Sequence, residues 1–274
     1  MANIIDGKAI SMDIKNEVKV KAEELKAKGI EPCLAVVLVG EDPASQVYVR
    51  NKKKACEYCG IKSLNYELSE DTTEEELLSL IDELNANKEC NGILVQLPLP
   101  KHIDENKVLL RIKPEKDVDG FHPYNVGLLS IGKADLKACT PAGCIELIKR
   151  SGVDITGKHC VVVGRSNIVG KPVGMLLLSE NGTVTTCHSK TKDIKAVCRE
   201  ADILVAAVGI PKFIKGDMVK DGVVVIDVGI NRMDNGKLCG DVDFDEVEKK
   251  ASYITPVPGG VGPMTIAMLM NNCI

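Results

Sequence analysis

The sequence has no excess of basic residues and no long apolar run. Its 35 lysines and arginines stand against 39 aspartates and glutamates, a formal net charge of −4. Without a basic excess, counterion release does not drive binding to nucleic acid, and anionic membranes are equally poor partners. No apolar stretch approaches the ~18 residues of a membrane-spanning helix, and the start lacks the basic and then apolar layout of a signal peptide. We therefore expect a cytoplasmic protein with no nucleic-acid or membrane partner.

The chain also lacks the spacing of a structural metal site. It has 11 cysteines, an odd number, and most of them lie in apolar runs. Cys56 and Cys59 form a CxxC pair, but no second CxxC or HxxxH partner follows. We expect no metal and mostly buried, reduced cysteines, and the role of Cys56 and Cys59, if any, stays open.

What the sequence does contain is enough apolar material for two domains. It has 274 residues, 45% of them hydrophobic, and a domain takes ~150 residues. Helix and strand patterns alternate along the whole chain, which is typical of α/β proteins with mostly parallel sheets. No repeat and no low-complexity linker interrupts them, so we expect the two halves to pack closely.

The first half shows helices and strands in alternation. Acids after a cap residue open one helix at 71–76, and Asp42-Pro43 begins another that runs to Gly60. Continuous apolar runs favour buried strands, and prolines 98 and 100 end the last of them. The predicted elements are helices over 8–28, from the turn at 42–45 to residue 60, and from the opening at 71–76, and strands over 33–39, 61–68 and 92–96.

The second half has the pattern of a nucleotide-binding domain. Thr140-Pro141 reads as a cap followed by proline at the first helical position, with a helix to about Arg150. Strands then recur at intervals that suit right-handed crossovers. The predicted strands cover 160–163, 183–186, 203–207 and 223–226.

A glycine-containing segment, Gly164 to Pro172, follows a predicted strand and opens a helix, where backbone amides bind the phosphates of a dinucleotide. It departs from GxGxxG because Ser166 replaces the second glycine, so a plain tight turn stays open. About 20 residues on, where NAD sites carry an acid, the chain reads Cys187-His188-Ser189-Lys190. An acid there would repel a 2′-phosphate, whereas Arg165, Ser189 and Lys190 suit one, so the local chemistry favours NADP.

A candidate reactive cluster lies in the first half. Tyr48 and Lys52 are four apart and share one helix face. A lysine turned into a cleft beside two other lysines would lose proton affinity and become a base near neutral pH, although each of the two side chains suits a solvated surface as well. Gln96 ends a buried strand at the edge where open sheets bind ligands, and an acid-and-glycine turn containing Asp119 follows.

Near the end of the chain, residues 255–265 combine three prolines and three glycines before an apolar helix. A segment with so little conformational freedom suits a rigid loop that clamps a flat ligand. An elaborate helix start, with Pro263 in its first turn, explains the composition equally well.

Taken together and in order, these motifs resemble those of the bifunctional methylenetetrahydrofolate dehydrogenase/methenyltetrahydrofolate cyclohydrolase family. The resemblance covers nearly the whole length. The matching segments are 48–52 (YVRNK), 92–100 (GILVQLPLP), 116–120 (KDVDG), 139–141 (CTP), 164–172 (GRSNIVGKP), 227–231 (DVGIN) and 256–265 (PVPGGVGPMT).

The resemblance implies an α/β enzyme with an N-terminal folate-binding domain, 1–138 completed by a C-terminal helix 258–274, and a Rossmann-type NADP-binding domain, 139–257. It implies oxidation of 5,10-methylenetetrahydrofolate to the 5,10-methenyl cation with NADP, then hydrolysis to 10-formyltetrahydrofolate at the same site, in one-carbon metabolism and purine biosynthesis. A homodimer is implied as well.

By the same resemblance, Lys52 handles the proton during hydrolysis, Gln96 hydrogen-bonds and tunes it, Tyr48 stacks on the folate and Asp119 anchors the amino edge of the pterin. The other implied site residues are Gly164, Arg165, Ser166, Ile168, Ser189 and Ile230 at the cofactor, and Pro256, Gly259 and Gly260 at the folate end. Two alternatives stay open: another NADP-linked dehydrogenase with an N-terminal substrate domain, and a non-catalytic cofactor-binding module.

Overall fold

The computed structural model describes residues 1–274, apart from the side chain of Ala44, and divides into two compact units. Unit 1 comprises Met1–Ser11 and Thr140–Thr265, and unit 2 comprises Met12–Cys139 and Ile266–Ile274. Each unit has its own hydrophobic core. The units differ from the expected domain limits chiefly at the N-terminus, because the short strand β1 (Asn3–Ile4) pairs with β11 (Tyr253–Ile254) and so joins unit 1.

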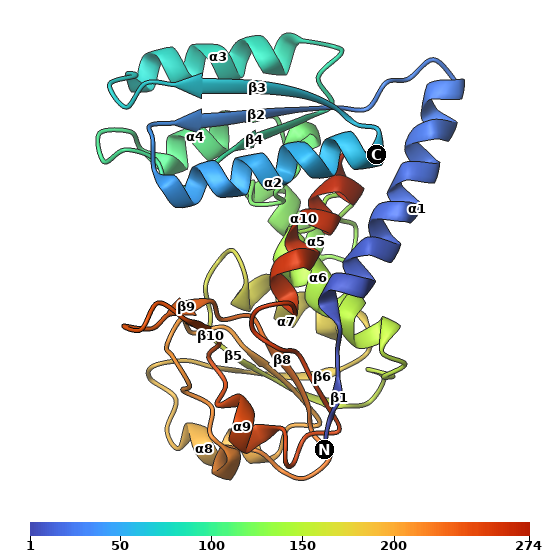
Figure 1. The fold of residues 1–274 in the computed structure, drawn as a ribbon, viewed down its shortest axis with the longest axis vertical. Helices are drawn as coiled ribbons and strands as arrows, with labels where there is room; N and C mark the ends of the chain where they lie inside the picture. The colour runs from blue at the N-terminus through green and yellow to red at the C-terminus, as the bar shows by residue number, and fades with distance from the viewer. The chain divides into compact units, whose positions relative to one another are not determined.

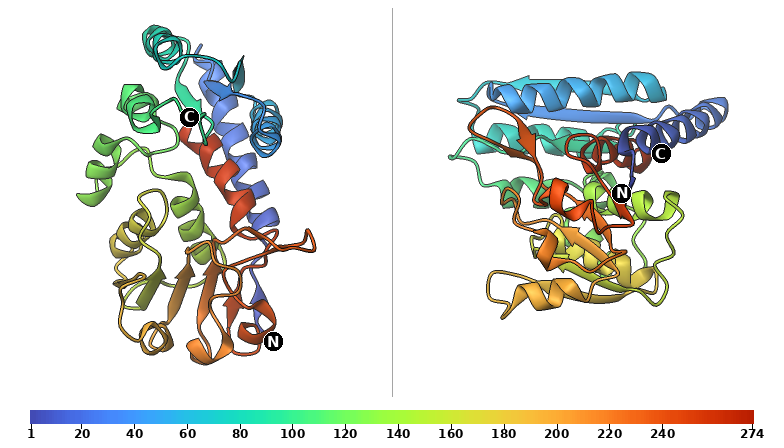
Figure 2. Two further views of the ribbon diagram at one scale, coloured as in Figure 1. Left: turned by 90° about the vertical axis from the view of Figure 1, so that its left-hand side faces the viewer. Right: turned by 60° about the horizontal axis from the view of Figure 1, so that its bottom comes forward.

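Unit 2 is built around a three-stranded parallel sheet in the order β3-β2-β4. Every residue of the central strand β2 is buried, as its unbroken apolar run predicts. Helix α3 and the short α4 pack on one face of the sheet, and α2 covers the other (Figures 1 and 2). The elements are α1 (Gly7–Ala27, entering from unit 1), β2 (Cys33–Val39), α2 (Pro43–Cys59), β3 (Lys62–Leu68), α3 (Glu74–Ala86), β4 (Gly92–Val95), α4 (Glu105–Arg111), the 3-10 turn η1 (Pro114–Lys116) and α5 (Pro123–Ser130).

Unit 1 is built around a six-stranded parallel sheet in the order β1-β11-β8-β7-β5-β6. Consecutive strands β5 and β6 run to one side and β7 and β8 to the other, so the strand order reverses between β5 and β7, as in doubly wound nucleotide-binding folds. The elements are α6 (Cys139–Arg150), β5 (His159–Val163), α7 (Gly170–Ser179), β6 (Thr183–Cys187), α8 (Ile194–Arg199), β7 (Ile203–Ala206), η2 (Gly216–Met218), β8 (Val224–Asp227), β9 (Asn231–Arg232), β10 (Leu238–Cys239) and α9 (Phe244–Val247). The last helix, α10 (Val261–Asn272), begins in unit 1 and belongs to unit 2 from Ile266 onward.

The expected α/β class with mostly parallel sheets is confirmed, and so are the main strands to within a residue or two. One helix start differs: α6 begins at Cys139, so Thr140 lies inside the helix rather than capping it. There the Thr140 hydroxyl lies 2.9 Å from that of Thr265 in unit 1, a tertiary contact that the local pattern does not reveal. None of the helices described here is both long enough and apolar enough to cross a membrane.

Candidate functional site

Helix α2 carries Lys52 and holds it in unit 2. The carboxylate of Asp42 accepts the N–H of Ser45 at 2.7 Å to cap the start of the helix. Gly60 ends the helix in the left-handed conformation, with φ of 73°, which glycine adopts without strain. Between these ends, Lys52 is only 9% exposed, whereas its neighbours Lys53 and Lys54 are exposed. The fold therefore selects one of three adjacent lysines for burial.

The Lys52 side chain is hydrogen-bonded to Gln96, which directly follows β4. Nζ of Lys52 donates to Oε1 of Gln96 at 2.9 Å. The amide nitrogen of Gln96 donates to the Leu97 carbonyl at 2.6 Å, and this bond leaves the amide oxygen facing the lysine. The backbone N–H of Gln96 continues the sheet by donating to Val37 at 2.8 Å. The sheet thus fixes the amide, and the amide fixes the amino group.

Asp119 lies in the turn after η1 and shares the electrostatic environment of Lys52. Burial raises the pKa of its carboxyl; the nearby Lys52 lowers this pKa and Asp117 raises it. Asp117 is itself buried and accepts from the His122 N–H at 2.8 Å and from Nδ2 of Asn125 at 3.0 Å, which anchors the turn. The structure therefore brings Lys52, Gln96 and Asp119 together in one polar cluster.

Tyr48 lies one helical turn before Lys52 on α2, and its side chain is 47% exposed. An exposed ring on the same helix face as the buried lysine is available to a flat ligand. This position agrees with the spacing argument, which expected the two side chains to share a face.

A pocket of about 370 Å³ opens in unit 1 where the strand order reverses. This is the edge at which doubly wound sheets bind nucleotides. Its walls come from the segments that follow β5, β6 and β7, together with parts of α8 and residue 213. The lining residues are Val163, Gly164, Arg165, Ser166, His188, Ser189, Ile194, Ala207, Val208, Ile210 and Phe213.

Four of the six expected cofactor residues line this pocket: Gly164, Arg165, Ser166 and Ser189. The other two do not. Ile168 is 49% exposed and lies outside the lining, and Ile230 lines a different pocket.

The turn after β5 is shaped to bring its backbone close to a ligand. Gly164 has φ of 131°, and a Cβ at this position would overlap the carbonyl oxygen of Ala207. The hydroxyl of Ser166, which stands at the second glycine position of the GxGxxG pattern, accepts from the N–H groups of Val169 and Gly170, each at 3.2 Å. The hydroxyl thus stabilises the turn into α7, and the N-terminus of α7 favours an anion.

The charge of this pocket suits an anionic ligand. Among the described residues that line it none is acidic, and Arg165 supplies a full positive charge. Lys190 does not line the pocket, but it is exposed directly after Ser189, which does. A nucleotide with an extra phosphate fits this set of donors.

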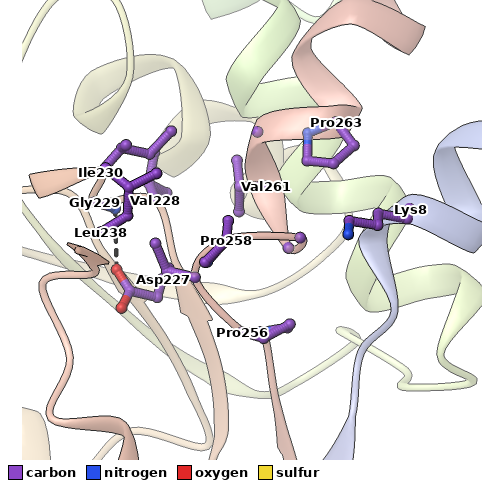
Figure 3. A pocket seen from close by; sticks show the side chains of 14 residues that line it. Lys8, Asp227, Val228, Gly229, Ile230, Leu238, Pro256, Pro258, Val261 and Pro263 are labelled. Atoms are coloured by element: carbon purple, nitrogen blue, oxygen red, sulfur yellow. Dashed lines mark hydrogen bonds between the residues drawn. The ribbon is translucent and has the colours of Figure 1, made fainter. Parts of the chain in front are cut away.

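A second pocket in unit 1, of about 180 Å³, joins the loop after β8 to the proline- and glycine-rich segment before α10 (Figure 3). Ile230, expected at the cofactor, lies here with Pro256, Gly259 and Gly260, which were expected at the folate end. Lys8 is the one basic residue among its described lining residues.

Sequence reasoning missed several of the residues around these pockets. Lys8 is far from the rest of its pocket in sequence, and no local pattern marks it. Asp227 belongs to one of the matching segments, but neither it nor Asp241 lies in a pattern that indicates a role. Both aspartates are at most 4% exposed, and burial is not visible in the sequence of a single polar residue.

The cysteines behave as small apolar residues. All but Cys239 are buried, and none forms a disulfide within the described chain. Burial raises the pKa of the Cys56 thiol to about 12 and that of Cys59 to about 11, so both are thiols rather than reactive thiolates. No group of three or more His, Cys, Asp or Glu side chains suited to a metal ion occurs among the residues described.

Comparison with known proteins gives a consistent result for both parts of the chain. Residues 5–119 match the family description "Tetrahydrofolate dehydrogenase/cyclohydrolase, catalytic domain". Residues 138–274 match "Tetrahydrofolate dehydrogenase/cyclohydrolase, NAD(P)-binding domain".

Full-length relatives and solved structures agree with these matches. The chain is 69% identical to the Bifunctional protein FolD of Agathobacter rectalis, covering 100% of this chain and 98% of that protein. The crystal structure of the FolD methylenetetrahydrofolate dehydrogenase/cyclohydrolase from Campylobacter jejuni has a TM-score of 0.97 at 55% identity, covering 100% and 97% of the two chains.

A third comparison is with the Trypanosoma brucei dehydrogenase-cyclohydrolase (FolD), whose structure is complexed with NADP cofactor and an inhibitor. It has a TM-score of 0.92 at 43% identity and covers 99% and 96% of the two chains. Since both family descriptions match in order and relatives align along the entire length, the chain belongs to the tetrahydrofolate dehydrogenase/cyclohydrolase family.

Proposed function

We propose that this enzyme oxidises 5,10-methylenetetrahydrofolate to 5,10-methenyltetrahydrofolate with NADP and hydrolyses the product to 10-formyltetrahydrofolate. The observation that carries the proposal is the hydrogen bond between buried Lys52 and Gln96 beside Asp119. A lone buried lysine would be costly, and a lysine fixed by a neutral amide is positioned without being neutralised by a carboxylate in direct contact.

In the hydrolytic step, Lys52 acts as the proton acceptor. Water attacks the methenyl carbon, a C–O bond forms, and the proton released from the water passes to the lysine amine. The hydroxyl group of this adduct then gives up its proton as the C=O bond forms, the C–N5 bond breaks and N5 takes up a proton, which leaves the formyl group on N10 with a net release of one proton. Gln96 acts by directing the amine through the 2.9 Å bond.

Binding of the folate uses the two remaining residues of the cluster. Tyr48 presents its exposed ring for stacking on the aromatic system of the substrate. The carboxyl of Asp119 bonds the amino edge of the pterin, which fixes the ring system relative to Lys52. From the family resemblance, we also propose Pro256, Gly259 and Gly260 as folate-binding residues.

The cofactor pocket fits a nicotinamide dinucleotide. The close approach at Gly164 and the start of α7 suit a pyrophosphate, and Arg165 with Ser189 suits the 2′-phosphate of NADP. NADP, when bound, accepts the hydride from the folate methylene. The remaining role of the chain is to position the two ligands. From the family resemblance, we also propose cofactor contacts for Ile168 and Ile230, whose exposed side chains lie outside the lining of this pocket.

We also propose, from the family resemblance alone, that the enzyme is a cytoplasmic homodimer and that its product serves purine biosynthesis. We propose residues 1–138 with 258–274 as the folate-binding domain and 139–257 as the NADP-binding domain, allowing for the first 11 residues that pack with unit 1.

The test is an ultraviolet assay of methenyltetrahydrofolate, whose absorbance rises with oxidation and falls with hydrolysis. We expect Lys52→Met to lower the hydrolytic rate by about 10²-fold or more, because a positioned general base contributes about 10²–10⁴-fold. The matched control is Lys53→Met, a change at an exposed neighbour, which should leave the rate within about twofold.

Two results would count against the proposal in different ways. A wild-type protein that forms no methenyl chromophore with NADP would contradict the proposed function. A Lys52→Met protein with full hydrolytic activity would leave the function standing but remove the role of the lysine.

A further inference from the structure

Two buried aspartates of unit 1 link the loops that form its two pockets. Asp227 ends β8 and is 4% exposed, and Asp241 follows β10 and is fully buried. Oδ1 of Asp227 accepts from the backbone N–H of Gly229 at 3.0 Å and of Asp241 at 2.9 Å, and Oδ2 accepts from Val242 at 3.0 Å. Figure 3 shows Asp227 below Val228, Gly229 and Ile230, with a dashed line for its hydrogen bond to Gly229.

Asp241 continues the chain of bonds toward the other pocket. Its Oδ2 accepts from the N–H groups of Val208 at 2.6 Å and Gly209 at 2.9 Å, and its Oδ1 accepts from Nδ2 of Asn231 at 2.9 Å. Val208 lines the pocket at β5, β6 and β7. The carboxylate of Asp241 therefore binds the loop after β7. The backbone N–H of Asp241 binds the carboxylate of Asp227, which also binds the loop after β8.

The fit around the two carboxylates leaves no room for adjustment. A methyl group at Gly240 would overlap Oδ2 of Asp227, and a methyl group at Gly229 would overlap Oδ1 of Asp241. Since neither glycine has a positive φ, close packing rather than backbone conformation explains them. The segments around 208, 229 and 241 thus form one rigid unit.

This rigidity matters for the cofactor because of what the loops carry. The loop at 207–210 forms one wall of the pocket that also contains Gly164 and Arg165, and a Cβ on Gly164 would meet the Ala207 carbonyl. The loop at 228–230 carries Ile230 in the second pocket. A displacement of the 207–210 loop would change the opening available to the cofactor.

We propose that Asp241 is a positioning residue for the nicotinamide cofactor. Its carboxylate fixes the 207–210 wall of the cofactor pocket and, through Asp227, aligns that wall with the loop carrying Ile230. Asp241 lines neither pocket, so it acts only through the loops that it binds. This inference rests on the proposed function for the identity of the cofactor.

The experiment compares Asp241→Leu with Asp241→Asn in the full-length protein. Leucine has a similar size but no acceptor, and it leaves the N–H groups of Val208 and Gly209 unpaired. Asparagine keeps one oxygen for these donors, and its NH2 group can donate to Asn231 once that amide is turned. We expect the NADP dissociation constant, measured by calorimetry, to rise about tenfold or more with leucine and at most about threefold with asparagine.

The rate of methenyltetrahydrofolate hydrolysis supplies the second readout. Its kcat should stay within about twofold in both variants, because hydrolysis consumes no cofactor, while the KM for NADP in the oxidation follows the dissociation constant. The matched control is Asp202→Asn. Asp202 lies just before β7, at the opposite edge of the sheet from the pocket. Its carboxylate accepts from the His159 N–H and from Lys220, and the loss of this carboxylate should leave the NADP affinity unchanged.

The proposal is overturned if Asp241→Leu binds NADP like the wild type, if Asp202→Asn weakens binding equally, or if the kcat of hydrolysis falls in parallel with NADP affinity. Parallel loss would show a general structural defect. A wild-type protein that binds NADP but produces no methenyltetrahydrofolate would instead contradict the proposed function. The role of Asp241 would still be tested by the NADP affinities of its variants.

Discussion

At the scale of single residues, Lys52 differs from its two neighbouring lysines in burial and not in chemistry. Lys52 is 9% exposed and bonded to Gln96, while Lys53 and Lys54 face solvent. Asp227 shows the same dependence on surroundings. Burial raises the pKa of its carboxyl to about 6, even though three backbone N–H groups, which favour the charged form, act in the opposite direction.

The raised pKa of Asp227 predicts a specific pH dependence of stability. The folded protein holds this proton up to about pH 6, whereas the unfolded chain releases it near the ordinary value of 3.8. The stabilisation from Asp227 is therefore fully present below pH 3.8 and is lost as the pH rises through 6. The free energy of unfolding in urea should be measured for the wild type and for Asp227→Asn. The value for the wild type minus that for the variant should decrease between about pH 4 and about pH 6.

Above about pH 7.5 the same difference should become independent of pH, since Asp227 is then ionised in both states. The asparagine side chain of the variant does not titrate, so the comparison cancels the other ionisable groups. A difference that stays constant from about pH 4 to about pH 7 would contradict the raised pKa.

At the scale of elements, short sequence signals decide where helices begin and end. In α3, Thr73 Oγ1 accepts from the Glu76 N–H at 3.2 Å, and Oε2 of Glu76 accepts from the Thr73 N–H at 2.9 Å. These two bonds form a capping box, at the helix start that the sequence predicts from a cap residue followed by acids. The cap orients α3 so that Leu77, Ile81 and Leu84 are buried in the core of unit 2.

We expect Thr73→Ala to lower the free energy of unfolding by about 1 kcal/mol, the typical contribution of a side-chain cap. Urea unfolding monitored by circular dichroism measures the change. Thr72→Ala is the matched control, because the Thr72 hydroxyl makes no hydrogen bond among the described contacts that would be lost. Equal effects of the two changes would show that the cap contributes nothing.

At the scale of the whole molecule, two units with separate cores are expected to respond differently to ligands. The cofactor pocket lies wholly in unit 1, and the Lys52 cluster lies wholly in unit 2. A ligand that binds only the folded state adds RT ln(1 + [L]/Kd) to stability, about 2.7 kcal/mol at about 100 times Kd. Cofactors of different affinity are therefore distinguished by thermal unfolding.

We expect NADP to raise the thermal midpoint of unfolding more than NAD at the same concentration. The reason is the pocket at Arg165 and Ser189, which carries positive charge and no acid among its described lining residues. Arg165→Ala should reduce the difference between the two cofactors. Equal stabilisation of the wild type by NAD and NADP would refute the predicted cofactor preference.

The α/β class, most strands and the helix boundaries that depend on neighbouring residues follow from local sequence patterns. Strand β2 is visible as an unbroken apolar run, and α3 begins at a capping box. Such features depend on the propensity and pattern of a few consecutive residues, so a short stretch of sequence is enough to predict them. The placement of Tyr48 and Lys52 on one helix face follows from the helical period alone.

Three features depend on how distant parts of the chain assemble: the burial of Lys52 rather than its neighbours, the pocket that Ile230 shares with Pro256, and the link that Asp241 makes between the loops at 208 and 229. The strand at Asn3–Ile4 is likewise formed by pairing with residues 253–254, and two residues are too few to show a period. Each of these features depends on groups distant in sequence. Burial and hydrogen bonding between such groups follow from how the sheets assemble, and a local pattern does not record them.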